Sequence, residues 1–223
     1  MSRPIVVFDL DGTLVDTAPD LVDTLNLILS REGIPPVAYD AARTLIGGGV
    51  RPMLEKALQE QGRSLPTADI DALFAAFLEH YGAHIADRSR PFPGVEAALD
   101  ILADRGLTLA VCTNKLEWLS LRLLDALGLS PRFAAICGQD TFGVKKPDPD
   151  VLRKTVTTAG ADIAQTIMVG DSVTDIRLAQ AARVPVVAVD FGYTEAHVTT
   201  FNPDAVISHY DRLPAAIFEL LPQ

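Results

Sequence analysis

Short runs of consecutive hydrophobic residues recur along the chain and alternate with stretches in which apolar residues have helical spacing. An uninterrupted apolar run of this kind is typical of a strand that is buried on both faces. We expect such strands at residues 4–8, 107–112, 133–137, 166–170, 184–189 and 204–207. Helices are expected at residues 94–105, 115–127, 149–160 and 173–182. This alternation predicts an α/β fold with a doubly wound parallel sheet, which is a Rossmann-like core.

The pattern changes between residues 16 and 90, where the sequence has helical periodicity and no convincing strand. Gly33 and Gly62 are expected to end two of these helices, because glycine readily adopts the left-handed conformation found at helix ends. We therefore expect residues 1–15 and 91–223 to form an α/β catalytic core, with a helical cap domain at 16–90. An insertion that leaves the sheet beside a strand end can cover that end as a lid.

Charge and composition narrow the classes of partner. The 223 residues carry a formal net charge of −10, which would repel a nucleic-acid backbone, and no block of lysines and arginines reverses it locally. The sequence has no apolar stretch long enough to span a bilayer and enters a strand directly, so we expect a cytoplasmic protein without a membrane partner. Cys112 and Cys137 lie in apolar runs, where reduced, buried thiols are expected. Because the chain as a whole is negative, any site that binds an anionic ligand must be made locally positive by a few residues or by a metal.

Polar residues follow several of the expected strands. After the first strand come Asp9, Asp11 and Thr13, and after the second come Thr113, Asn114 and Lys115. The motif GDSVTD begins at the end of the strand at 166–170. A single aspartate at a strand end is more often a cap or turn residue than a catalyst. Ligands of open α/β sheets bind at the carboxyl ends of the strands, however, so several such ends with compatible chemistry predict a site there.

Four aspartates are the candidate metal ligands. Asp171 and Asp175 are four residues apart at the start of an expected helix, which would place them on one face. Together with Asp9 and Asp11 they form a set of oxygen donors without a nearby histidine or thiolate, and this favours Mg²⁺. The alternative is that Asp171 and Asp175 are ordinary acidic residues at a helix N-terminus, favoured by the helix dipole. Asp9 ends a buried strand and would be held rigidly, which suits a nucleophile.

These residues resemble the motifs of the haloacid dehalogenase-like superfamily. The matching segments are DLDGT at 9–13, Thr113 in VCTNK, Lys146 before Pro147 in KKPDPD, and GDSVTD at 170–175. They occur in the family's order, the resemblance covers essentially the whole chain, and the helical insertion resembles the family's cap domain. Lys146 is favoured over its neighbour Lys145, which remains an alternative.

The resemblance implies a phosphoryl-transfer mechanism. Asp9 would attack phosphorus to form an aspartyl-phosphate, and Asp11 would protonate the leaving oxygen and then activate water. Thr113 and Lys146 would hold and neutralise the phosphoryl oxygens. Enzymes of the superfamily that act on carbon lack the second aspartate that Asp11 supplies, so dehalogenase chemistry is disfavoured.

The resemblance also implies how Mg²⁺ would be bound. Its ligands would be Asp9, the backbone carbonyl of Asp11, and Asp171, with Asp175 supporting the metal directly or through another ligand. The metal would offset the repulsion between an anionic nucleophile and an anionic substrate.

Within the superfamily, DLDGTLVDTAPDL, IGGGV and KKPDPD are similar to segments of phosphoglycolate phosphatases. This similarity implies hydrolysis of 2-phosphoglycolate, a small anionic metabolite, to glycolate and phosphate. Asn114 and the loop IGGGVRPML are expected to bind the substrate, with Gly48 offering a backbone N–H and Arg51 pairing with the carboxylate. The loop could instead be a flexible helix connection that carries a solvent-exposed arginine.

Other functions remain open at this stage. A sugar-phosphate mutase or a pyrophosphatase of the same superfamily would share the core motifs. A phospho-aspartate receiver module also uses an aspartate and a magnesium ion in a doubly wound sheet, but it needs about half this length and no helical lid. Neither the oligomeric state nor the residues of the cap that read the substrate follow from the sequence.

Overall fold

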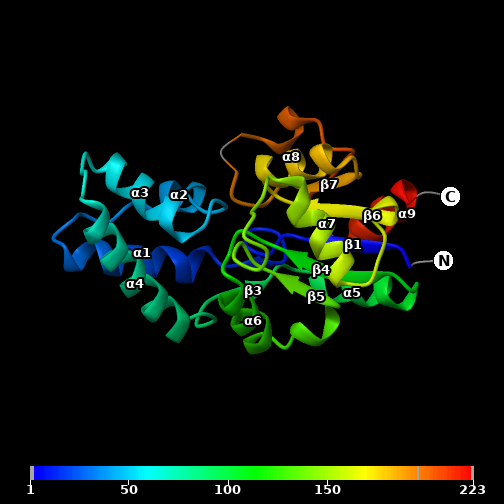
Figure 1. Cartoon of the computed structure of the whole chain (residues 1–223), viewed down its shortest axis with the longest axis horizontal. Helices are drawn as coiled ribbons and strands as arrows, with labels where there is room; N and C mark the ends of the chain where they lie inside the picture. Colours follow the sequence, from blue (N-terminus) through cyan, green and yellow to red (C-terminus); the bar gives the residue numbers. More distant parts are fainter. Residues whose placement is uncertain (1–2, 195, 222–223) are drawn as a thin grey trace.

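The computed structural model describes residues 3–194 and 196–221 and is built around a parallel β-sheet (Figure 1). Neighbouring strands pair in the order β5-β4-β1-β6-β7-β8, with β1 in the interior of the sheet. The strands are β1 (Ile5–Phe8), β4 (Thr108–Cys112), β5 (Ala135–Cys137), β6 (Thr166–Gly170), β7 (Val186–Val189) and β8 (Ala205–Ile207). This confirms the predicted α/β fold, and each strand lies within its predicted range.

Helices cover both faces of the sheet, which explains why its strands are hydrophobic without alternation. Val6 and Phe8 of β1 belong to a hydrophobic cluster that also contains residues of α5, α6 and α9. Ile5 and Val7 point to the opposite face and pack with α7 and α8. The bounds of these helices are α5 (Val95–Asp104), α6 (Glu117–Ala126), α7 (Pro149–Thr158), α8 (Val173–Ala182) and α9 (Leu213–Leu220). Helix α9 was absent from the sequence prediction.

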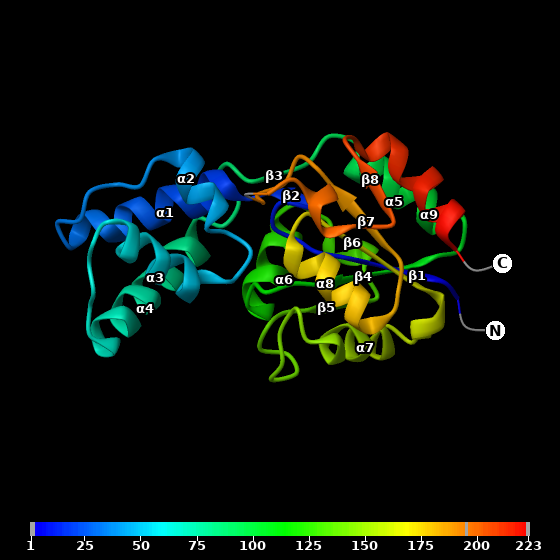
Figure 2. The same ribbon diagram turned by 90° about the horizontal axis from the view of Figure 1, so that it is seen from above.

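The helical insertion packs into a separate layer beside the carboxyl end of the sheet (Figures 1 and 2). Its helices are α1 (Ala18–Arg31), α2 (Tyr39–Thr44), α3 (Val50–Glu60) and α4 (Thr67–Ala83). Helix α4 contacts both α1 and α3, and buried side chains such as Leu25, Leu54 and Phe77 fill the space between them. We refer to α1–α4 as the cap.

A short antiparallel ribbon connects the cap to the sheet. Strand β2 (Val15–Asp16) pairs with β3 (Arg90–Pro91), so the chain leaves and returns at the same place. We propose this ribbon as the boundary between the cap and the α/β core.

Two further expectations concern thiols and membranes. Cys112 of β4 lies opposite Cys137 of β5, and both are free and buried, as expected. Burial raises the pKa of each thiol, to about 12 for Cys112, so both are protonated at neutral pH. In the part of the chain that the structure describes, every helix is too short or too polar to cross a bilayer.

Candidate active site

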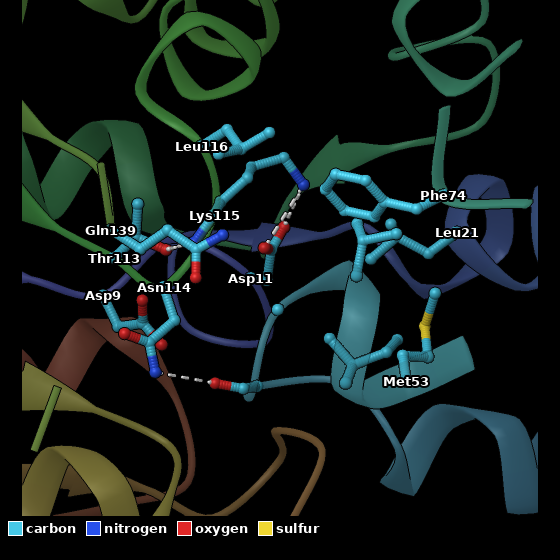
Figure 3. Close-up of a pocket in the computed structure, with 14 residues that line it drawn as sticks. Asp9, Asp11, Leu21, Met53, Phe74, Thr113, Asn114, Lys115, Leu116 and Gln139 are labelled. Atoms are coloured by element: carbon cyan, nitrogen blue, oxygen red, sulfur yellow. Dashed lines mark hydrogen bonds and ion pairs between the residues drawn. The ribbon is translucent and has the colours of Figure 1, made fainter. Parts of the chain in front are cut away.

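Three adjacent strands bring predicted site residues together at the carboxyl end of the sheet. Asp9 follows β1, and its backbone N–H donates to the Val169 carbonyl of β6 at 2.9 Å, so the extended ladder holds it in register. Asp171 follows β6 directly, and Thr113 follows β4 on the other side of β1. Asp9, Asp11 and Thr113 line a cavity between the carboxyl end of the sheet and the cap that is partly open to solvent (Figure 3).

A cluster of buried carboxylates lies at this edge. Asp9, Asp171 and Asp175 each offer an oxygen within 4.8 Å of the others, and all are buried. Asp171 is oriented by two donors, because the Thr13 hydroxyl donates to its Oδ1 at 2.9 Å and the Tyr193 backbone N–H donates to its Oδ2 at 2.8 Å. The predicted carboxylates of Asp9, Asp171 and Asp175 are thus brought together.

Glycines on two sides make room for Asp171. A Cβ at Gly12 would lie 2.5 Å from Asp171 Oδ2, and one at Gly192 would lie 2.2 Å from Asp171 Cβ. Gly12 also has a φ of +81°, which a residue with a side chain rarely adopts. The turn after Asp11 therefore requires glycine both for its backbone and for the space beside the metal-ligand candidate.

The electrostatics of the cluster favour a bound cation. Burial, together with Asp175 and Asp171, raises the pKa of Asp9 to about 8, although Lys146 lowers it. Burial and Asp175 likewise raise the pKa of Asp171 to about 7, against the hydrogen bonds from Tyr193 and Thr13. Negative charge on Asp9 or Asp171 is therefore only partly compensated by the protein groups around it, and a bound cation would stabilise the ionised forms.

Lys146 is the positive charge that the protein itself supplies to this cluster. Its side chain is 1% exposed, and its Nζ lies 2.7 Å from Asp9 Oδ1 and 2.7 Å from Asp175 Oδ1. Burial by itself would lower the pKa of Lys146, but Asp175 and Asp9 outweigh it and raise the pKa. The neighbouring Lys145 is exposed, so the structure favours Lys146 over the alternative.

Asn114 positions Lys146 and also reaches the cap. Its Oδ1 accepts the Lys146 backbone N–H at 3.0 Å, and its Nδ2 donates to the Lys146 carbonyl at 3.4 Å. The same Nδ2 donates to the Gly47 carbonyl of the cap at 3.2 Å (Figure 3). Asn114 was predicted to bind the substrate. It lines the cavity, but in this structure its amide is hydrogen-bonded to backbone groups of Lys146 and Gly47.

Asp175 was predicted to support the metal, and the structure shows that its side chain caps helix α8 and contacts Lys146. Helix α8 begins at Val173, so Asp171 precedes the helix, and the two aspartates do not share a helical face. Asp175 forms a capping box with Ser172, whose backbone N–H and hydroxyl donate to Asp175 Oδ2 at 3.1 Å and 2.6 Å. Its other oxygen contacts Lys146. Asp175 therefore joins the helix N-terminus to the lysine.

Asp11 faces away from the carboxylate cluster. Its Oδ1 accepts the Thr17 hydroxyl at 2.8 Å, and Lys115 Nζ lies 2.9 Å from Oδ1 and 3.2 Å from Oδ2. The sequence interpretation gave Lys115 no role. Its position directly after Thr113 and Asn114 was the available signal, but the contact with Asp11 spans 104 residues and has no local signature.

The structure places Arg51 and Gly48 outside this cavity. The Arg51 guanidinium pairs with Asp71 of α4 and lies 4.0 Å from Glu55, and its side chain is 39% exposed. The expectation that Arg51 points at the substrate is therefore corrected, because two carboxylates of the cap hold it. Gly48 lines a second opening of the site, while its neighbours Gly47 and Gly49 line the cavity.

Arg43 of α2 attaches the cap to the loop beside Asp171. Its Nη2 donates to the carbonyls of Phe191 and Gly192 at 2.8 Å and 3.0 Å, and its guanidinium lies 5.0 Å from the centre of the Tyr193 ring. This is the loop whose backbone N–H holds Asp171. The position of the cap and the position of Asp171 are thus connected through one short segment.

Tyr193 also connects that loop to the start of the cap. Its hydroxyl accepts the backbone N–H groups of Thr17 at 2.7 Å and Ala18 at 2.9 Å, and donates to Asp16 Oδ1 at 2.7 Å. The first turn of α1 therefore depends on a side chain more than 170 residues away.

Replacing Tyr193 with phenylalanine should destabilise the protein by about 2–3 kcal/mol, because buried donors of Thr17 and Ala18 would lose their acceptor. Urea unfolding would measure this change. Tyr39→Phe is the matched control, since Tyr39 is exposed and should change stability by less than about 0.5 kcal/mol. Equal stability of Tyr193→Phe and the wild type would show that these hydrogen bonds contribute little.

The donor set fits a hard divalent cation. Asp9 Oδ1 is buried, and among the described residues its one close polar partner is the Lys146 ammonium at 2.7 Å, so the oxygen keeps a lone pair for a metal. Each oxygen of Asp171 accepts one hydrogen bond and keeps a further lone pair. Carboxylate oxygens are the ligands that Mg²⁺ and similar ions prefer. Asp11 could join them through its backbone, because its carboxylate is directed elsewhere.

Comparisons with known proteins show the family to which the chain belongs. The family model described as "Haloacid dehalogenase-like hydrolase" matches residues 6–189. The chain belongs to this family. It is 53% identical over 221 residues to the phosphoglycolate phosphatase of Mesorhizobium japonicum, covering 99% of this chain and 97% of that protein. It is 47% identical to the phosphoglycolate phosphatase of Agrobacterium fabrum, covering 98% and 94%.

A solved structure is also similar over the whole fold. The crystal structure of a predicted phosphoglycolate phosphatase from Haemophilus somnus superposes with a TM-score of 0.89 at 27% identity, covering 96% of this chain and 98% of that one. The family match confirms the resemblance inferred from the sequence motifs, and it excludes the alternative of a phospho-aspartate receiver module.

Proposed function

We propose that this haloacid dehalogenase-like hydrolase is a Mg²⁺-dependent phosphatase that converts 2-phosphoglycolate to glycolate and phosphate. The observation that carries the chemistry is the buried set of Asp9, Asp171 and Lys146, which offers a carboxylate nucleophile beside both a metal-binding group and a fixed cation. The substrate is supported by the names and the near full-length similarity of the relatives.

Asp9 is the nucleophile in this proposal. One carboxylate oxygen forms a bond to phosphorus while the bond between phosphorus and the ester oxygen breaks. Lys146 lies beside Asp9 and Thr113 lines the same cavity, so an ammonium and a hydroxyl are available to the phosphoryl oxygens. The carboxylate is held by the end of β1 and needs no rearrangement before the attack.

Asp11 is the general acid and base. It donates a proton to the leaving oxygen of glycolate, and then accepts a proton from the water that attacks phosphorus in the aspartyl-phosphate. This second step releases phosphate and restores the Asp9 carboxylate. The hydroxyl of Thr17 and the ammonium of Lys115 orient the Asp11 carboxylate in the cavity.

Asp9, Asp171 and the Asp11 backbone carbonyl would hold Mg²⁺, with Asp175 in support through Lys146 and Ser172. The bound ion supplies charge neutralisation between the anionic nucleophile and the anionic substrate. Thr13 and the Tyr193 backbone keep Asp171 oriented for that purpose.

A phosphate-release assay tests the function directly. The purified protein, with Mg²⁺, is offered 2-phosphoglycolate, pyrophosphate and glucose 6-phosphate, and inorganic phosphate is measured. We expect the highest kcat/KM for 2-phosphoglycolate, and a reversible loss of activity when EDTA removes the metal. Preference for pyrophosphate, or phosphoryl transfer between sugar phosphates without release of phosphate, would replace this function by one of the alternatives. Activity undiminished by EDTA would contradict the role of the metal.

A further inference from the structure

Lys115 holds a buried ammonium group at the wall of the cavity, on the cap side of Asp11 (Figure 3). Its side chain is 3% exposed, and Nζ lies 2.9 Å from both Asp11 Oδ1 and the Tyr81 hydroxyl. The ammonium also lies 4.5 Å from the centre of the Tyr81 ring. A lysine on a surface samples many positions, whereas these contacts from the core and from α4 hold this charge at one point.

The charges that line the cavity single out Lys115. Among the described residues of its wall, the charged ones are Asp9, Asp11 and Lys115, so Lys115 is the cation there. Lys146 contacts Asp9 and Asp175 at the other end of the site. The wall on the cap side is largely apolar, and its side chains include Leu21, Met53 and Phe74. A second anionic group on a substrate whose phosphoryl group is at Asp9 would find its positive partner in Lys115.

Lys115 can contact a ligand without losing its present partners. An ammonium group has three N–H donors. Two of them reach Asp11 Oδ1 and the Tyr81 hydroxyl at 2.9 Å, and the third lies at the longer distance of 3.2 Å from Asp11 Oδ2, so a ligand oxygen could replace that contact while Asp11 and Tyr81 each keep a bond. Without Lys115, a substrate carboxylate placed beside Asp11 would be repelled by the negative charge of the Asp11 side chain, which disfavours binding. A neutral group in the same place would gain much less from the ammonium.

We propose that Lys115 is a specificity-determining residue that selects small phosphate esters with a second anionic group, such as a carboxylate. This inference rests on the proposed function, because it takes the phosphoryl group to be at Asp9. It differs from the sequence expectation, which gave the carboxylate to Arg51. It also differs from a role limited to orienting Asp11, which would affect all phosphate esters alike.

Two matched substrates separate these roles. 2-Phosphoglycolate and 2-hydroxyethyl phosphate have similar size, but the carboxylate of the first is a neutral CH₂OH group in the second. We expect the wild type to prefer 2-phosphoglycolate, and Lys115→Met to reduce that preference in kcat/KM by about 10- to 100-fold. Lys115→Arg should retain part of the preference because it keeps the charge. Lys145→Met, which removes an exposed lysine, should leave the preference unchanged.

Inhibitor binding gives a second readout that does not depend on turnover. The inhibition constant of 3-phosphonopropionate should rise in Lys115→Met about as much as the substrate preference falls, while that of 3-hydroxypropylphosphonate should change little. If Lys115→Met does not fold, Lys115→Gln replaces it, since an amide keeps donors toward Asp11 and Tyr81 without the charge.

The outcomes separate this inference from the function on which it rests. A wild type that releases no phosphate from any ester would overturn the proposed function. An active wild type whose Lys115→Met variant loses activity equally toward both substrates would overturn the specificity role alone. An active wild type that does not distinguish the two substrates would do the same.

Discussion

Replacing Asp9 with asparagine should lower kcat by about 10⁴-fold or more while leaving the protein folded. The amide has nearly the shape of the carboxylate but is a poor nucleophile, and loss of a nucleophile has effects of this size. The fold should tolerate the change because Asp9 is buried beside Asp171 and Asp175, and its pKa is already raised to about 8. A neutral group suits that position in the metal-free protein.

Phosphate release with 2-phosphoglycolate and Mg²⁺ would measure the loss, and thermal unfolding in EDTA would check the fold. Asp104→Asn is the matched control, because Asp104 is exposed on α5, away from the carboxyl end of the sheet. Asp104→Asn should retain full activity. Turnover by Asp9→Asn within tenfold of the wild type would rule out Asp9 as the nucleophile.

Lys146→Met should both slow the reaction and destabilise the protein. Removing the ammonium takes away a fixed charge near the phosphoryl group, which should cost about 10²- to 10³-fold in kcat/KM. It also leaves Asp9 and Asp175 buried without their cation, and breaking a buried ion pair in this way costs about 3–5 kcal/mol. Because Lys146 lowers the pKa of Asp9, the variant should regain some activity as the pH rises and Asp9 ionises.

Lys145→Met tests the choice between the two lysines. Lys145 is exposed, so its replacement should change kcat/KM and stability little. The comparison is made by kinetics between pH 6 and pH 9 and by urea unfolding. Large losses in Lys145→Met with small ones in Lys146→Met would reverse the assignment.

The hydrophobic pattern was sufficient to predict the strands, because a strand buried on both faces must be apolar at every position. Val6 and Val7 face opposite layers, for example, and both are fully buried. The order of the strands was not predictable in this way, since β1 pairs with β4 and β6, which are more than 100 residues away. The ribbon of β2 and β3 was missed because two-residue strands leave no periodicity.

The acidic residues were found from the sequence because they lie at or near strand ends, and strand ends meet. Lys146 follows no strand directly and was identified through the resemblance of KKPDPD to a family motif. Arg51 was misplaced because its partner Asp71 lies on another helix of the cap, and nothing local reveals that pair. Lys115 and Tyr193 were missed for a similar reason. The Lys115–Asp11 contact joins two loops of the core that are 104 residues apart, and the Tyr193 contact depends on how the start of α1 packs on the core.

The bonds from Arg43 to the Phe191 and Gly192 carbonyls have a thermodynamic consequence. The same segment holds Asp171 through the Tyr193 backbone N–H, so if the cap moves, its docking is expected to be linked to cation binding at Asp171. Linkage is reciprocal: any cation that favours the docked arrangement must itself be bound more tightly by molecules already docked, and by the same factor. A substitution that weakens the Arg43 contact in the cap should therefore lower the affinity of the Asp171 site for its cation.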